Sequence, residues 1–178
     1  MKLNKEGITL ECVEGDITRQ IGIDAVVNAA NAYLRYGGGV AGAIHRAAGP
    51  ELEKACRPLA PIKPGESVIT PAFNLPNRYV IHCLGPVYGV DKPEDDLLSR
   101  CYRNALKLAE KHKIYSIAFP AISTGAFGFP MEGAAKVAFT TVLNTISELS
   151  SVKNIRFVLY DKESFNICDN ILFDLAGS

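Results

Sequence analysis

Short apolar runs alternate with glycine-rich or polar connections along most of this 178-residue chain. Short runs of this kind, bounded by turn residues, predict strands, and adjacent apolar residues within a run indicate burial on both faces. Six strands are predicted in this way, at Ile8–Glu14, Asp24–Asn28, Ser67–Thr70, Arg78–Cys83, Ser116–Ala121 and Ile155–Tyr160.

Longer segments between the strands have helical periodicity. The clearest apolar stripe has the spacing of one helix face and consists of Leu98, Cys101, Tyr102, Ala105, Leu106 and Ala109. The polar residues Asp91–Asp96 before it are predicted to form a connection. The predicted helices are a small-residue segment that ends near Gly49, and then Pro50–Cys56, Leu97–Lys113, Met131–Leu149 and Glu163–Leu175.

This alternation of strands and helices predicts an α/β fold, a three-layer α/β/α sandwich with a mixed central sheet. We expect a mixed sheet because the first two predicted strands have no helix between them, whereas parallel neighbours need a long crossover. No linker divides the chain, so residues 1–178 are expected to form a single domain.

Two glycine-rich loops each join a predicted strand to a predicted helix. The first contains Gly37, Gly38 and Gly39, and the second runs over residues 122–130. Glycine allows positive φ and close approach, while unpaired N–H groups at a helix N-terminus attract anions. Ligands of open α/β sheets bind beyond the carboxyl ends of strands. We therefore expect both loops at one sheet edge, binding a ligand with two phosphates.

The first loop does not match the common nucleotide motifs. No lysine or hydroxyl residue follows the glycines, as a P-loop would require. The spacing Gly37-x-Gly39-x-x-Gly42 fits a dinucleotide fingerprint, but it lies about nine residues beyond the strand, too far for the tight turn of that motif. On the glycines alone, a structural hinge without a ligand stays an alternative.

Composition narrows the class of protein further. Nineteen basic and nineteen acidic side chains balance, which disfavours broad electrostatic binding to nucleic acid. No apolar tract is long enough to span a membrane and no export signal is evident, so we expect a cytoplasmic protein. The histidines lack the mutual spacing of metal ligands, and we predict neither a metal nor another cofactor. His82, inside a predicted strand, is expected to be partly buried and hydrogen-bonded.

The cysteines are scattered singly, without a Cys-x-x-Cys pair, which is typical of reduced and mostly buried thiols. They are Cys12, Cys56, Cys83, Cys101 and Cys168.

Several polar and aromatic residues follow the predicted strands. Asp16 is suited to accept a hydrogen bond from an exocyclic amine such as that of adenine, or to cap a turn. Tyr160 is suited to stack on a base, or to be an ordinary half-buried aromatic. Asn28 and Asn31 offer amides for sugar hydroxyls. Phe127, between two glycines at a loop tip, is hard to explain as a core residue and is expected to pack on a ligand.

Four segments together resemble the motifs of macro domains, the modules that bind ADP-ribose. They are Gly15–Thr18, Val27–Asn31, Gly37–Ile44 and Pro120–Pro130, and they occur in family order over nearly the whole chain. The resemblance implies an α/β/α sandwich that holds ADP-ribose across the sheet edge.

The resemblance also implies individual roles. Asp16 would bond the adenine amine beside the backbone of Ile17, and Tyr160 would pack on the adenine. Asn31 would hold the distal ribose hydroxyls and is the predicted catalytic residue, with Asn28 as a second binding amide. The diphosphate and distal ribose would lie among Gly38, Gly39, Val40, Ser123, Thr124, Gly125, Ala126 and Phe127.

One position departs from many hydrolytic relatives, which have an aspartate where this chain has Ala41. A methyl group neither accepts a proton nor orients water. Other macro domains share the Gly-Gly-Gly-Val-Ala-Gly sequence, and some of these still hydrolyse ADP-ribose from protein. His45, four residues later, would share the helix face of Ala41, but relatives that keep the aspartate carry the same histidine, so it does not compensate.

We therefore expect a protein that binds ADP-ribose or ADP-ribosylated protein. It is expected to hydrolyse mono-ADP-ribose from acidic side chains, or O-acetyl-ADP-ribose. The alternatives are a non-catalytic reader of ADP-ribosylated proteins and a phosphatase acting on ADP-ribose 1″-phosphate.

Overall fold

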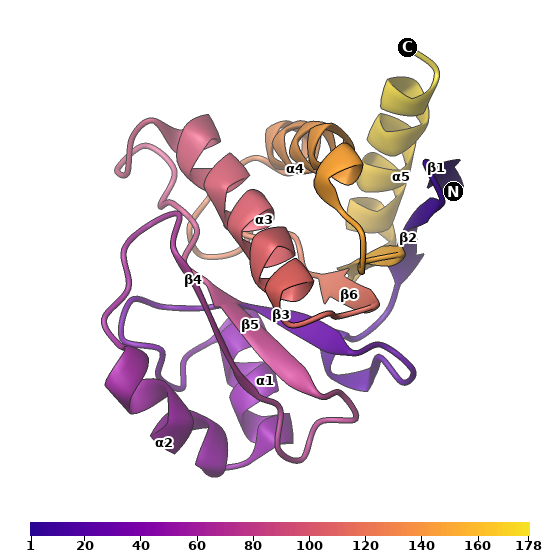
Figure 1. Cartoon of the computed structure of the whole chain (residues 1–178). Coiled ribbons are helices and arrows are strands. Elements are labelled where there is room, and N and C mark those ends of the chain that lie inside the picture. Colours follow the sequence, from indigo (N-terminus) through magenta and orange to yellow (C-terminus); the bar gives the residue numbers. More distant parts are fainter.

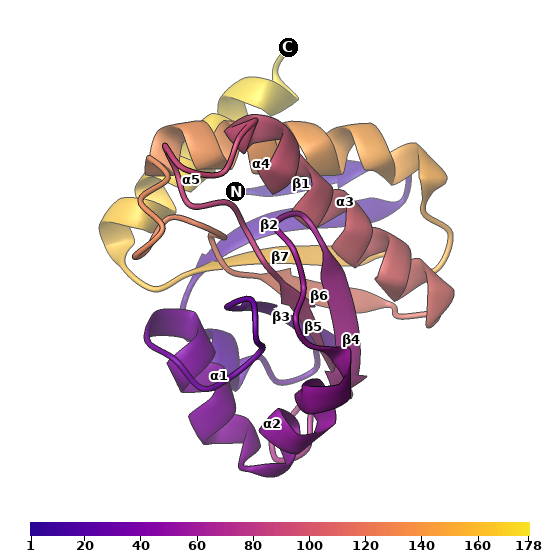
Figure 2. The same cartoon turned by 90° about the vertical axis from the view of Figure 1, so that its left-hand side faces the viewer.

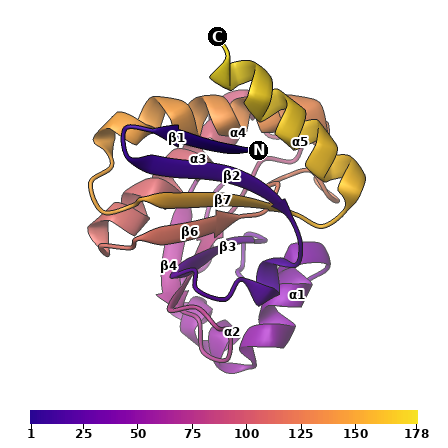
Figure 3. The ribbon, with the colours of Figure 1, turned by 90° about the vertical axis from the view of Figure 1, so that its right-hand side faces the viewer.

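One seven-stranded sheet runs through the structure, a computed structural model that describes residues 1–178. Its spatial order is β1-β2-β7-β6-β3-β5-β4, and Figure 3 shows β1 at one outer edge. The strands are β1 (Lys2–Lys5), β2 (Ile8–Glu14), β3 (Ala25–Ala29), β4 (Ser67–Pro71), β5 (Tyr79–Cys83), β6 (Ser116–Phe119) and β7 (Asn154–Leu159).

The mixed sheet predicted from the sequence is confirmed, but its antiparallel pairs lie where the prediction did not place them. The five central strands are parallel, and only the edge strands β1 and β4 run antiparallel to their neighbours β2 and β5. Strands β2 and β3, which have no α-helix between them in sequence, are separated in the sheet by β7 and β6. Strand β1 was not predicted, because Lys2–Lys5 contains one apolar residue and lies at an exposed edge, where lysine is common.

Two helical layers cover the sheet, as the sequence predicted. Helices α1 (Gly39–Ala48) and α2 (Glu51–Cys56) lie on one face. Helices α3 (Glu94–Lys111), α4 (Met131–Thr145) and α5 (Lys162–Ala176) lie on the other (Figures 1 and 2). None of the helices is long and apolar enough to cross a membrane. Short 3-10 turns follow β2, α2 and α4, at η1 (Ile17–Arg19), η2 (Arg57–Leu59) and η3 (Ile146–Glu148).

Helix boundaries were the least accurate part of the prediction. Helix α3 begins at Glu94, so Glu94, Asp95 and Asp96 form its first turn and not the predicted connection. Carboxylates are favoured there because they face the positive end of the helix dipole. Helix α4 ends at Thr145 and tightens into η3, short of the predicted end at Leu149.

Two separate apolar clusters form the core. The larger contains 31 buried residues between the sheet and α3, α4 and α5, whereas the smaller contains 16 between the sheet and α1 and α2. All five cysteines are free and buried, as predicted. The helices on the smaller cluster follow the loops after β3, so this half of the core supports one of the two glycine loops.

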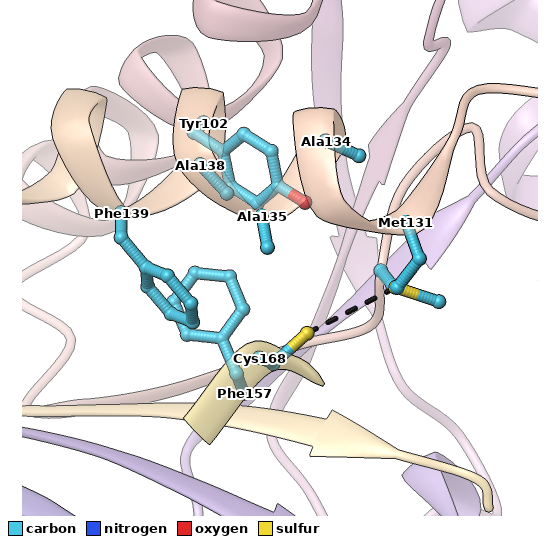
Figure 4. Close-up of a pocket in the computed structure, with 9 residues that line it drawn as sticks. Tyr102, Met131, Ala134, Ala135, Ala138, Phe139, Phe157 and Cys168 are labelled. Carbon is cyan, nitrogen blue, oxygen red and sulfur yellow. Dashed lines mark hydrogen bonds between the residues drawn. The ribbon is translucent and has the colours of Figure 1, made fainter. Parts of the chain in front are cut away.

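A cavity of about 10 Å³ lies inside the larger cluster. Figure 4 shows its wall of apolar side chains, with the sulfur of Cys168 3.9 Å from that of Met131. A space of this size holds about one water, but a buried water needs two or more polar partners. The Tyr102 hydroxyl instead donates to the Pro120 carbonyl and accepts from the N–H of Ile122. The cavity is therefore a packing gap, and Tyr102 anchors the base of the second glycine loop.

Candidate functional site

The carboxyl ends of the five parallel strands share one edge of the sheet. Along it, in spatial order, follow Asp16 after β2, Tyr160 after β7, the second glycine loop after β6 and the first glycine loop after β3. The prediction that both glycine loops lie at one edge is confirmed, since β3 and β6 are direct parallel neighbours. An extended ligand lying across the strands would therefore meet Asp16 and Tyr160 at one end and the two loops at the other.

The first glycine loop leads directly into the N-terminus of α1. Gly38 is the N-cap residue, and Gly42 donates the first intrahelical bond back to the Gly38 carbonyl. The N–H groups of Gly39, Val40 and Ala41 precede that bond and have no partner within the helix. Together with the helix dipole they favour an anion at this place.

The glycines of this loop meet different requirements. Gly39 has a φ of +54°, which favours glycine. A Cβ on Gly42 would lie 2.3 Å from the Gly37 carbonyl oxygen, so the loop and the helix cross too closely for any side chain. Gly38 has an ordinary φ of −88°, and a Cβ there would meet nothing within 4 Å. Neither backbone conformation nor packing requires a glycine at position 38. The absence of a side chain on Gly38 therefore leaves open space next to the loop.

The second glycine loop is tied to the core at its base and open at its tip. Thr124 donates hydrogen bonds from both its N–H and its hydroxyl to the Ala121 carbonyl, and the N–H of Gly128 donates to the Gly125 carbonyl. Gly125 and Ala126 are exposed. A Cβ on Gly125 would again meet nothing within 4 Å, and its φ is not positive. Gly38 and Gly125 are thus two glycines, on neighbouring loops, that the protein's own packing does not explain.

Ser123 turns its side chain away from the open edge. It has a φ of +69°, and its hydroxyl is buried without a hydrogen-bond partner. A Cβ on Gly85 would lie only 2.1 Å from this hydroxyl oxygen. A ligand at the edge would therefore contact Ser123 through its backbone.

Asn31 forms a clasp on its own loop. Its amide nitrogen donates to the Arg35 carbonyl at 2.8 Å, and its amide oxygen accepts from the Arg35 N–H at 3.0 Å. A primary amide has two N–H donors and two oxygen lone pairs. The side chain of Asn31 is partly exposed. One donor and one acceptor site thus remain for a ligand.

Asp16 is held in place by Thr18. Its Oδ1 accepts from the Thr18 N–H at 2.8 Å and from the Thr18 hydroxyl at 2.7 Å, and Arg19 lies 4.0 Å from Oδ2. The hydrogen bond from the Thr18 hydroxyl has the largest effect in lowering the pKa of Asp16, and the bond from the Thr18 N–H lowers it further. Asp16 is therefore ionised at neutral pH. The structure thus shows the turn cap that was the alternative prediction, and Oδ2 remains able to accept a further bond. Ile17 is buried against α1, so a ligand would meet its backbone.

Tyr160 is 85% exposed at the end of β7. The ordinary half-buried aromatic that was its alternative interpretation is therefore wrong. A ring so exposed, next to the turn of Asp16 across β2 and β7, is available for stacking on a flat ligand.

Asn28 lies beneath the edge and not on it. Its side chain is fully buried, and its amide nitrogen lies 3.1 Å from Nδ1 of His82. Nε2 of His82 in turn lies 2.9 Å from the Thr70 hydroxyl. Burial lowers the pKa of His82 to about 3, so this ring is neutral, hydrogen-bonded and more deeply buried than predicted. The Asn28 side chain is therefore inaccessible to a sugar hydroxyl, contrary to the prediction.

The expectation that Phe127 has no place in the core is wrong, whereas its packing on a ligand stays a prediction. Phe127 is half-buried and packs against the smaller apolar cluster, so its side chain has a structural role as well as a place at the loop tip. Its carbonyl accepts a hydrogen bond from the N–H of Tyr88 at 2.8 Å.

A third loop, residues 84–93 after β5, also reaches this edge and was missed by sequence reasoning. The ring of Tyr88 packs on Phe129, with ring centroids 4.9 Å apart. Gly85 leaves room for the Ser123 hydroxyl because it has no side chain. The signal was present in Gly85-Pro86 directly after a buried strand, since such a strand end shares the edge of its parallel neighbours.

Comparison with known proteins identifies the family. The family model described as the Macro domain matches residues 27–138, which include both glycine loops. The chain belongs to the macro domain family. Its relatives include an O-acetyl-ADP-ribose deacetylase of Salmonella typhimurium, 48% identical over 168 residues that cover 92% of this chain and 93% of the relative. A macro domain-containing protein of Methanosarcina mazei is 48% identical over 92% of this chain and 87% of its own length.

Solved macro domains share the fold. The Oceanobacillus iheyensis macrodomain with ADP superimposes with a TM-score of 0.95 at 42% identity, covering 99% of this chain and 96% of that one. A Trypanosoma brucei macrodomain in complex with ADP-ribose gives a TM-score of 0.84 at 34% identity, over 90% of this chain and 68% of that one. The α/β/α sandwich inferred from the sequence is therefore that of the macro domains.

This macro domain has no titratable group in the first turn of α1. Ala41 is buried there. His45, one turn later, is 5% exposed, and its Nε2 is buried without a partner. Burial lowers its pKa, so it is a neutral ring inside the protein and does not reach water at the edge.

Proposed function

We propose that this macro domain binds ADP-ribose and hydrolyses mono-ADP-ribose esters, either on acidic side chains of proteins or in O-acetyl-ADP-ribose. The observation that carries the proposal is the pair Gly38 and Gly125, two glycines over open space on adjacent loops beside the N-terminus of α1. Glycine at such positions lets a bound group approach the backbone closely. The unpaired N–H groups and the positive dipole end of α1 favour a diphosphate at this place.

The order of residues along the edge supports the orientation of the ligand. Asp16 and Tyr160 follow β2 and β7, and would bind the adenine. Asn31 follows β3, two strands further along. Its remaining donor and acceptor match a pair of ribose hydroxyls. The distal ribose would lie at Asn31, with the diphosphate among Gly38, Gly39, Val40, Thr124, Gly125 and Ala126.

For an ester at C1″ of the distal ribose, the chemistry demands little acid–base help. In such an ester the water oxygen forms its bond to C1″ as the bond between C1″ and the ester oxygen breaks, and the carboxylate leaves as an anion. Because a carboxylate is stable as an anion at neutral pH, no general acid is required. The water loses its proton to solvent or to a phosphate oxygen of the ligand. Catalysis of this kind rests on positioning by Asn31 and on exclusion of bulk water by the second glycine loop, so turnover should be slow.

The buried methyl of Ala41 favours a second candidate, a non-catalytic reader of ADP-ribosylated proteins. A reader needs the same loops and fails only to organise the attacking water. A phosphatase acting on ADP-ribose 1″-phosphate is a third candidate. Release of phosphate from that compound, without loss of protein-linked ADP-ribose, would identify it.

The test is release of label from a protein mono-ADP-ribosylated on Glu or Asp, with enzyme in excess. Wild-type release that Asn31→Ala abolishes would support the hydrolase. Absence of release together with tight calorimetric binding of ADP-ribose would make the protein a reader. Arg103→Gln serves as the control and should behave as wild type. Arg103 is exposed on α3, on the face of the sheet opposite to α1.

We further propose that residues 1–178 form one macro domain and that it acts in the cytoplasm. The single continuous sheet supports the first point. The five free cysteines support the second, since exported proteins commonly pair theirs.

A further inference from the structure

Four exposed side chains, three from the loop that follows Asn31 and one from α1, are not among the residues proposed above to bind ADP-ribose. Tyr33 and Tyr36 are 59% and 54% exposed, and Arg35 and Arg46 are also exposed. We call Tyr33, Arg35, Tyr36 and Arg46 the arginine–tyrosine patch. Three of its members follow β3 directly, and Arg46 comes from the last turns of α1.

The backbone under the patch is held by its neighbours. Leu34 is fully buried, with a φ of +57°, and so fixes the turn between Tyr33 and Arg35. The Asn31 clasp binds both the carbonyl and the N–H of Arg35. This turn therefore presents Tyr33, Arg35 and Tyr36 in a defined arrangement.

The guanidinium groups are also held, but by aromatic rings and not by carboxylates. Arg46 donates from Nη1 to the Tyr36 hydroxyl at 2.7 Å and lies 5.9 Å from the centre of that ring. Arg35 lies 5.5 Å from the centre of the Tyr33 ring. Cation–π contacts of this kind orient a guanidinium without neutralising its charge.

Neither arginine forms an ion pair. The ion pairs of the structure join other residues, and no carboxylate oxygen lies within 4.0 Å of Arg35 or Arg46. A guanidinium has five N–H donors, and Arg46 donates with one of them to the Tyr36 hydroxyl. Two oriented positive charges with free donors thus stand at the surface.

The place of the patch decides what could reach it. Asn31, proposed to hold the distal ribose, is hydrogen-bonded to the backbone of Arg35. Gly37 lies against the same side chain, since a Cβ on Gly37 would be 3.2 Å from the Asn31 amide nitrogen. The distal ribose carries the bond to the modified protein. The polypeptide on either side of the modified residue would therefore emerge next to the patch.

We propose that the arginine–tyrosine patch docks an acidic peptide segment that flanks the ADP-ribosylated residue of the substrate protein. The proposal rests on the proposed function, since it assumes that ADP-ribose occupies the edge beside Asn31. Arginine recognises carboxylates through paired N–H donors, and tyrosine supplies contact area at low entropic cost. Two isolated guanidinium groups on a chain with no net charge suit a short acidic peptide better than the repeated charges of a nucleic acid backbone.

The experiment compares two synthetic peptides that carry ADP-ribose on the same central residue through a hydrolysis-resistant linkage. One has glutamates on both sides of that residue and the other has glutamines. Wild-type protein should bind the glutamate peptide about fivefold more tightly at about 50 mM salt, and about equally at about 500 mM, because exposed charge pairs are weak and screened. The double variant Arg35→Gln, Arg46→Gln should bind both peptides equally and keep the wild-type affinity for free ADP-ribose.

A charge-matched control is available on α3, where Arg103→Gln with Lys107→Gln removes two exposed positive charges from the other face of the sheet. This control should keep the preference for the glutamate peptide. If it loses the preference, net charge and not the patch is responsible, and the proposal is wrong.

Three further outcomes would also overturn the proposal. They are equal binding of both peptides by wild type, a preference that survives in the patch variant, and loss of free ADP-ribose binding in that variant. An oligonucleotide carrying ADP-ribose at its end, bound in a patch-dependent manner while the peptides are not distinguished, would assign the patch to nucleic acid instead. Ester-linked versions of the same peptides test hydrolysis separately. A preference without turnover would contradict the proposed activity and leave the docking site standing.

Discussion

The crossing of the first glycine loop over α1 gives the sharpest test of the site. In Gly42→Ala, the new methyl would lie 2.3 Å from the Gly37 carbonyl oxygen. Carbon–oxygen contacts ordinarily lie at about 3.3 to 3.6 Å, so loop and helix must separate by about 1 Å. The same methyl would also approach Nη1 of Arg46 to 3.1 Å. Because Gly38 follows the displaced carbonyl directly, the open space for the ligand should change as well.

The effect of the Gly42→Ala clash on the free energy of unfolding can be separated from the gain in helix propensity by comparison with a matched variant. Gly133→Ala places a methyl in the first turn of α4, at an ordinary 3.6 Å from Phe129. Both substitutions gain up to about 1 kcal/mol of helix propensity, which cancels when the two variants are compared. The remaining difference is the strain of overpacking, about 1 to 3 kcal/mol. For a chain of this size, that corresponds to a difference in Tm of about 2 to 12 °C.

Two assays follow, thermal unfolding and calorimetric titration with ADP-ribose. We expect Gly133→Ala to unfold at or above the wild-type Tm, and Gly42→Ala below that of Gly133→Ala. ADP-ribose should bind Gly42→Ala about tenfold or more weakly, which corresponds to about 1.4 kcal/mol. If both variants unfold at the same temperature and bind ADP-ribose like wild type, the close approach of Gly37 and Gly42 does not shape the site.

Three other perturbations test separate parts of the structure. Asp16→Ala should weaken ADP-ribose binding by about 1 to 3 kcal/mol through loss of a charge-assisted bond, and an unchanged calorimetric affinity would remove Asp16 from the site. Asn31→Ala should lower kcat more than it raises KM; a proportional change in ADP-ribose affinity and turnover would make Asn31 a binding residue only. His82→Gln should flatten the acid dependence of stability. The folded-state pKa of about 3 lies below the unfolded value near 6.5, so the unfolded chain binds more protons between these values, and stability rises with pH across that window. The slope lost in the variant should reach up to about 1.4 kcal/mol per pH unit in urea unfolding between about pH 4 and pH 7, and an identical slope would show that His82 does not titrate as described.

The central strands were predictable because they are buried on both faces, and continuous apolar runs have few other uses. All six predicted strands are present within two residues of their predicted bounds. Strand β1 escaped detection because Lys2–Lys5 contains one apolar residue, whereas the other edge strand, β4, has the adjacent apolar residues Val68 and Ile69. The start of α3 was missed for a related reason, since Glu94–Asp96 look like a loop until the helix dipole that favours them is known.

The site was predictable where backbone chemistry decides it and not where side-chain direction does. The glycines of both loops, and their shared edge, follow from strand order and helix N-termini. The inward turn of Ser123 depends on a positive φ and on the missing side chain of Gly85 across the loop. The burial of Asn28 depends on His82 in the neighbouring strand. Contacts between distant segments of this kind have no local pattern in the sequence.

The Asn31 clasp and the two unequal cores have a consequence for how such a protein tolerates change. The first glycine loop, the clasp and the buried His82 all rest on the smaller apolar cluster, whereas α3, α4 and α5 pack on the larger one. Substitutions on the outward faces of α3–α5 should therefore alter heat tolerance while leaving ligand preference intact, whereas changes at Tyr102 would also reach the second glycine loop. Substitutions beneath α1 and α2 should shift both together. The solvent-facing residues of α3–α5 are thus open to diversification, while the first glycine loop is constrained by the smaller cluster and the second by Tyr102.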